Sequence, residues 1–99
     1  MLESTACYET DSGSKYLVQL CKHFAHKIEV SYDERDGRCV FGGAVGLLEA
    51  DESALRMTVR APDEEWLERA QSIIEVHLVR FAWREDMEKL DWVRQAGEA

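Results

Sequence analysis

A run of apolar residues at three- and four-residue steps predicts a helix over residues 15–27. Its apolar positions fall in one arc of the helix cylinder and are Leu17, Leu20, Cys21, Phe24 and Ile28. Residues 12–14 read Ser-Gly-Ser, and a serine there can accept a backbone N–H at the helix start. We therefore expect an amphipathic helix that places the small Cys21 side chain in the core.

A second stripe with the same period predicts a helix that starts near residue 61 and ends near residue 84. Pro62 is tolerated in a first turn, and the three carboxylates of residues 63–65 complement the helix dipole there. The stripe is formed by Trp66, Leu67, Ala70, Ile74, His77, Leu78 and Phe81. Trp83 points away from this stripe and is therefore a candidate interaction surface.

Alternation of apolar and polar residues, with turn-forming residues in between, predicts strands in the rest of the chain. The five strands span residues 4–10, 28–32, 38–41, 44–50 and 55–60. Residues 33–37 are expected to form a hairpin turn with Gly37 in the left-handed conformation, and Gly42 and Gly43 a second turn or a bend. Residues 90–93 could form a final short strand or a tail over the core, and residues 96–99 are expected to fray.

The order of these elements predicts the fold class. Consecutive strands with short turns imply a mainly antiparallel sheet, and both helices need an apolar surface to cover. We therefore expect one α+β domain over residues 1–99, a two-layer sandwich with both helices on one face of a curved sheet. The same element order is found in the fold of the TATA-binding protein, an analogy that concerns the fold alone.

Charge and cysteine content narrow the classes of function. Among 99 residues, 12 are basic and 20 are acidic, which gives a net charge of −8. Nucleic acids and anionic membranes need basic patches, so neither is expected as a partner. The cysteines are three and singly spaced, which favours reduced thiols, and residues 1–4 have no signal-peptide character. We therefore expect a cytoplasmic protein.

Three histidines carry the only candidate chemistry. In the sequence Cys21-x-His23-x-x-His26, a helix would point Cys21 and His23 about 160° apart, whereas His23 and His26 would lie about 60° apart and could share a ligand. Solvated histidines at a helix C-terminus explain the same residues without a site. His77 belongs to the second apolar stripe and could be a core residue. If the helices lie side by side, His77 could instead approach His23 and form a metal-binding or titrating site, with Tyr16 or Cys21 as a neighbour.

Two longer motifs resemble one family. Residues 15–27, KYLVQLCKHFAHK, and residues 77–85, HLVRFAWRE, are similar to the two signatures of the bacterial family called domain of unknown function 2218. The length of the chain and the Leu90-Asp91-Trp92 ending also fit, although Trp83 stands where another aromatic residue is expected. The resemblance implies a small cytoplasmic protein without assigned chemistry. Some family members are associated with siderophore-interacting flavoproteins, which implies a role beside iron uptake.

Three functional hypotheses follow. The first is an accessory domain that binds a metal, an iron chelate or a partner protein through His23, His26 or His77. The second is an interaction or dimerisation module, using a sheet edge or Trp83, with purely structural histidines. The third, an enzyme with a histidine as general base, is weaker because the chain has neither a Gly-x-Ser-x-Gly motif nor a phosphate-binding loop. No catalytic residue is assigned, and no particular cofactor is indicated.

Overall fold

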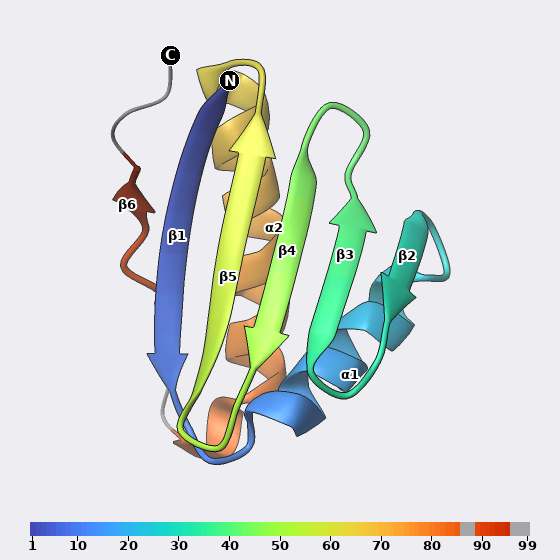
Figure 1. Cartoon of the computed structure of the whole chain (residues 1–99), viewed down its shortest axis with the longest axis vertical. Helices are drawn as coiled ribbons and strands as arrows, with labels where there is room; N and C mark the ends of the chain where they lie inside the picture. Colours follow the sequence, from blue (N-terminus) through green and yellow to red (C-terminus); the bar gives the residue numbers. More distant parts are fainter. Residues whose placement is uncertain (86–88, 96–99) are drawn as a thin grey trace.

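In the computed structural model, which describes residues 1–85 and 89–95, a six-stranded antiparallel sheet carries two helices on one face (Figure 1). The other face is covered by neither helix and is called the open face below. The strands are β1 (Leu2–Glu9), β2 (Glu29–Tyr32), β3 (Asp36–Val40), β4 (Val45–Ala50), β5 (Ala54–Ala61) and β6 (Val93–Arg94). The predicted α+β two-layer arrangement is confirmed.

The strands are ordered β2-β3-β4-β5-β1-β6, so the first strand of the chain lies inside the sheet. β1 pairs with β5 along its whole length, from Leu2 opposite Ala61 to Glu9 opposite Ala54. On its other side β1 pairs with the two-residue β6. The predicted C-terminal strand therefore exists, but it is shorter and begins later than residues 90–93. Residues 96–99, predicted to fray, lie outside the described residues.

Helix α1 (Gly13–Phe24) buries the predicted apolar face against the sheet. Its buried residues are Gly13, Tyr16, Leu17, Leu20, Cys21 and Phe24. Ser12 occupies the N-cap position, but its side chain accepts no capping hydrogen bond. The helix also ends at Phe24, before the predicted end at residue 27, so His26 lies in the turn that follows and is exposed.

Helix α2 (Glu64–Phe81) begins with a cap of the expected chemistry. The Asp63 carboxylate accepts a hydrogen bond from the backbone N–H of Trp66 at 2.9 Å, which satisfies one of the unpaired donors of the first turn. The helix buries Leu67, Ala70, Ile74 and Leu78. It ends at Phe81 and is followed by a short 3₁₀ turn, η1 (Trp83–Glu85), where the prediction continued the α-helix to residue 84. None of the described helices has the length and apolar content that a membrane-spanning helix requires.

Glycine positions correct two details of the predicted turns. Gly37 does not close the β2–β3 hairpin but lies within β3 opposite Tyr32, and it is not among the glycines with positive φ. A Cβ at Gly37 would lie 2.8 Å from Sγ of Cys21, so the α1 contact explains why a glycine stands there. The hairpin is closed by Asp33, whose carboxylate accepts hydrogen bonds from the backbone N–H groups of Arg35 and Asp36.

Gly42 and Gly43 form the β3–β4 turn and receive the side chain of Trp66 from the start of α2. Gly42 has a φ of 73°, the left-handed conformation that glycine adopts without a Cβ clash. A Cβ at Gly43 would lie between 2.4 and 2.6 Å from three atoms of the indole ring. This close approach of a flat ring to bare backbone fixes the N-terminus of α2 on the sheet.

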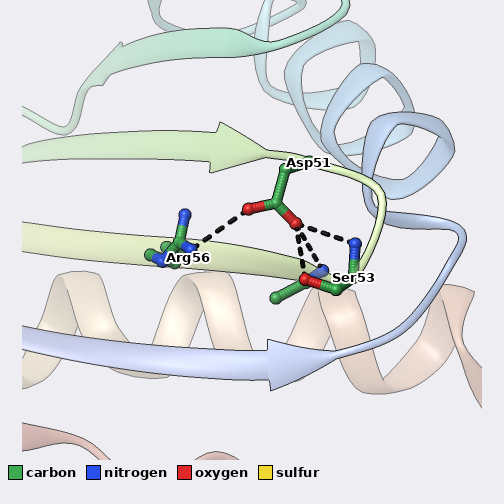
Figure 2. Close-up of polar contacts among 4 residues, drawn as sticks. Asp51, Ser53 and Arg56 are labelled. Carbon is green, nitrogen blue, oxygen red and sulfur yellow. Dashed lines mark hydrogen bonds and ion pairs between the residues drawn. The ribbon is translucent and has the colours of Figure 1, made fainter.

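The β4–β5 turn is organised by a single carboxylate (Figure 2). Asp51 accepts hydrogen bonds from the backbone N–H of Ser53 at 2.8 Å, from the Ser53 hydroxyl at 3.0 Å and from the backbone N–H of Ala54 at 2.9 Å. Its second oxygen pairs with the Arg56 guanidinium at 3.1 Å. The donors, with the Ser53 backbone first, lower the pKa of Asp51 to about 2. The Arg56 side chain therefore reaches back toward the β4–β5 turn, at the start of its strand β5.

Candidate functional site

The two helices bring His23 and His77 together at their C-terminal ends. His23 is the second-to-last residue of α1, and His77 lies about one turn before the end of α2. The centroids of the two imidazole rings are 4.6 Å apart, with an angle of 44° between the planes. The predicted approach of these residues is confirmed, whereas their use as ligands stays a prediction. We call His23 and His77 the histidine pair.

Phenylalanine rings hold the histidine pair from both helices. Phe24 meets the ring of His77 edge-on at 5.2 Å between centroids, and Phe81 meets the ring of His23 in the same way at 6.0 Å. Phe24 is buried and in turn contacts Phe41 at 5.3 Å. His77 is partly buried and His23 is exposed, so the pair rests on the aromatic edge of the core and faces solvent on one side.

A backbone contact sets the tautomer of His77. Its Nδ1 lies 2.7 Å from the carbonyl oxygen of Ile73, one helical turn earlier. A carbonyl only accepts hydrogen bonds, so Nδ1 carries the proton and donates it. In the neutral ring, the lone pair is then on Nε2. Histidines that bind metals are commonly oriented in this way, with one ring nitrogen donating to a backbone carbonyl.

Positive charge surrounds the histidine pair, although the chain as a whole carries −8. The pKa of His23 is lowered, first by partial loss of hydration and then by the nearby charges of His77, His26, Lys27 and Arg80. The charged form of His23 is therefore disfavoured. Lys27 and Arg80 are exposed, so the surface beside the pair is cationic and accessible.

The pair is not part of a larger set of metal ligands within residues 1–85 and 89–95, where no group of three or more His, Cys, Asp or Glu side chains is placed to hold an ion. His26 contributes charge near His23 but lies beyond the helix end, so the helical spacing that would have paired the two rings does not apply. A role for His26 as a ligand stays a prediction. Two imidazoles are fewer than the three or four protein ligands that zinc sites use.

Tyr16, one of the two expected neighbours of the pair, is engaged at the opposite end of α1. Its hydroxyl donates to the carboxylate of Glu85, which also accepts from Tyr8 at 2.7 Å and from Thr10 at 3.0 Å. Burial and the hydrogen bond to Glu85 raise the pKa of Tyr16 to about 12. No local signal in the sequence indicates the three hydroxyl partners of Glu85.

Cys21, the other expected neighbour, is fully buried and faces the sheet. Its Sγ lies over Gly37 of β3, and its thiol lies beside that of Cys39, which is on β3 as well. Burial and this contact raise the pKa of Cys39. The prediction that Cys21 is a small core residue is confirmed.

Trp83 is exposed, with 65 % of its surface accessible, compared with 39 % for Tyr32. Its indole ring carries the guanidinium of Arg84 at 5.1 Å from the ring centroid, a cation–π contact. The prediction that Trp83 points away from the core is confirmed. Its use as an interaction surface stays a prediction.

Comparison with known proteins identifies a family and a solved structure to which the chain is similar. The model of a family described as "Uncharacterized protein conserved in bacteria (DUF2218)" matches residues 5–93. The NMR structure of PA4090 from Pseudomonas aeruginosa is 33% identical, with a TM-score of 0.79 and complete coverage of both chains. No curated protein matches. The chain therefore belongs to the bacterial DUF2218 family, as its two helix motifs predicted.

Proposed function

We propose that the protein is a non-catalytic accessory domain that binds a transition metal, iron in the first instance, held in an anionic chelate. The histidine pair would donate to the metal, and the cationic surface beside it would hold the negative charge of the chelator. The observation that carries the proposal is the 4.6 Å approach of His23 and His77 with Lys27 and Arg80 close by. The association of family members with siderophore-interacting flavoproteins, implied by the resemblance, agrees with it.

The protonation states of the two rings support metal donation. Because Nδ1 of His77 donates to Ile73, Nε2 is the nitrogen that carries the lone pair in the neutral ring, and the lowered pKa of His23 favours the neutral form of that ring. Neutral imidazole is a good ligand for iron, zinc, copper and nickel.

The cationic neighbours favour a chelate over a bare ion. Lys27 and Arg80 repel a free divalent cation that approaches His23, whereas they attract carboxylate or phenolate groups of a chelator. A chelator would also fill the coordination positions that two imidazoles leave open. The two sets of residues thus have complementary tasks: the imidazoles contact the metal and the cations contact the organic ligand.

The test is calorimetric titration of the purified protein with ferric citrate, with citrate alone and with zinc ion alone. We expect saturable binding of ferric citrate that is stronger than that of citrate. His77→Ala should abolish this excess, and Arg80→Gln should weaken ferric citrate while leaving zinc unchanged or slightly stronger. His26→Ala is the matched control, an exposed histidine next to the site, and should retain binding.

Two outcomes would overturn the proposal. The first is equal heats for ferric citrate and citrate, which would remove the metal from the interaction. The second is undiminished ferric citrate binding by His77→Ala, once circular dichroism shows that the variant is folded.

A second candidate function, a protein interaction or dimerisation module, is favoured by the exposed Trp83. A large aromatic side chain at 65 % exposure is a common anchor at protein interfaces. Sedimentation equilibrium of the wild type and of Trp83→Ala tests it. A dimer that dissociates in the variant supports the module, and a monomer in both excludes self-association through this residue.

A further inference from the structure

The open face of the sheet has a hollow that the histidine pair does not use. Its volume is about 640 Å³, and its lining residues come from β1, β2, β3, β4 and β5 and from the β2–β3 turn. The face of these strands that lies away from both helices is the one turned toward the viewer in Figure 1. Volumes of this size are typical of small-ligand sites. Arg60 and Glu3 in its lining are paired with each other, and Asp33 accepts the hydrogen bonds that close the β2–β3 hairpin. The lining residues that remain for a ligand are Asp36, Arg38, Leu47, Glu49 and Thr58.

Strand register places an apolar contact surface between polar groups in the centre of this hollow. Ser31, Arg38, Leu47 and Thr58 stand opposite one another in a single row across four strands. Leu47 is partly buried and is flanked by the guanidinium of Arg38 on one side and the hydroxyl of Thr58 on the other. Arg38 is exposed and forms no ion pair with any carboxylate of the described residues. Its donors are therefore available for a ligand anion.

Two carboxylates face each other on one side of Arg38. Asp36 precedes Arg38 by two residues on the same face, and it is directly opposite Glu49. Like charges opposite each other in a sheet destabilise it, and an added cation relieves them. Arg56 stands opposite Glu49 in the register but pairs with Asp51 instead (Figure 2). Among the described residues, Asp36 and Glu49 therefore have no ion-pair partner and are available to a cationic group of a ligand.

We infer that the hollow binds a short zwitterionic peptide. Its carboxylate would pair with the Arg38 guanidinium, its ammonium group with Asp36 and Glu49, and an apolar side chain would cover Leu47. Positions two apart on a strand are separated by about 7 Å. An extended dipeptide has about the same reach. A single amino acid is shorter, and a dianion is disfavoured by the two carboxylates.

The experiment is a ¹⁵N–¹H correlation titration of the whole chain with glycyl-leucine. We expect saturable shifts at Ser31, Leu47 and Thr58, and none at His77. N-acetyl-glycyl-leucine, without the ammonium group, and glycyl-leucinamide, without the carboxylate, should both bind more weakly. Arg38→Gln should weaken glycyl-leucine about tenfold or more, the effect of losing one charge-assisted hydrogen bond.

Arg69→Gln is the matched control, because Arg69 is an exposed arginine that pairs with Glu65 on α2, away from the hollow. It should bind the dipeptide as the wild type does. The inference is overturned if no saturable shift occurs, if the blocked peptides bind equally well, or if Arg38→Gln and Arg69→Gln behave alike. His77→Ala should leave the dipeptide shifts unchanged, so that this test succeeds or fails independently of chelate binding.

Discussion

Replacing Gly43 with alanine should destabilise the protein through one identifiable contact. The added Cβ would lie 2.4 Å from the nearest atom of the Trp66 ring, where ordinary contact begins near 3.4 Å. The ring would have to move by about 1 Å, or the β3–β4 turn would have to open by the same amount. Because Gly43 is not a positive-φ glycine, the backbone itself accepts alanine and the steric contact is isolated.

The magnitude is the difference between two opposing effects. Overpacking of this kind costs about 1–3 kcal/mol. Alanine also lowers the conformational entropy of the unfolded chain, which stabilises the folded state by about 0.4–1 kcal/mol. We therefore expect a net loss of about 1–2 kcal/mol. For a domain of this size such a loss lowers the melting temperature by about 4–16 °C.

The assay is thermal and urea unfolding, followed by circular dichroism, of a double-mutant cycle with Trp66→Ala. The three atoms nearest to the new Cβ all belong to the indole ring, and they are absent in this background. Gly43→Ala should then become neutral or stabilising by up to about 1 kcal/mol, so the effect changes sign. The reasoning would be refuted if Gly43→Ala cost the same in both backgrounds, or if it cost nothing in the wild type.

Two further predictions concern single carboxylates. Asp63→Ala removes the acceptor for the Trp66 N–H and should cost about 1 kcal/mol in urea unfolding, whereas Asp63→Asn should retain most of the stability. The hydrogen bonds from Tyr16 and Tyr8 lower the pKa of Glu85, so its contribution is fully present above the unfolded value and is lost as the pH falls through the lower, folded value. Glu85→Gln should therefore be less stable than the wild type at pH 7, and the difference should shrink below about pH 4.3; a difference that stays constant with pH would contradict this explanation.

The helices were predictable because their patterns are local. Leu17, Leu20 and Phe24 recur at helical steps, and each is buried against the sheet. The approach of His23 and His77 was one of two interpretations that the sequence left open, the other being a core position for His77, and the packing of both helices on one sheet face brings the two rings together. The tautomer of His77 could not be predicted, because it depends on the Ile73 carbonyl within the folded helix.

Prediction from the sequence failed where the role of a residue depends on a partner that is distant in the sequence. Gly37 was assigned to the turn because glycine usually serves there, yet Asp33 closes the turn and the thiol of Cys21 is what excludes a side chain at Gly37. Nothing in the polar segment around Glu85 indicates a partner, yet its carboxylate accepts hydrogen bonds from three hydroxyls of the N-terminal part of the chain. Such long-range contacts produce no periodic pattern in the sequence.

The interior position of β1 has a consequence for synthesis on the ribosome. The first strand finds no neighbour in the sheet until β5 has been made, because Leu2 pairs with Ala61. Until then the N-terminal segment emerges with both edges unpaired, which favours wrong pairing or capture by chaperones. Long-range pairing of this kind also slows folding. Strands β2 to β5 can therefore pair one after another as they are made, whereas the oldest part of the nascent chain is among the last to gain its native neighbours.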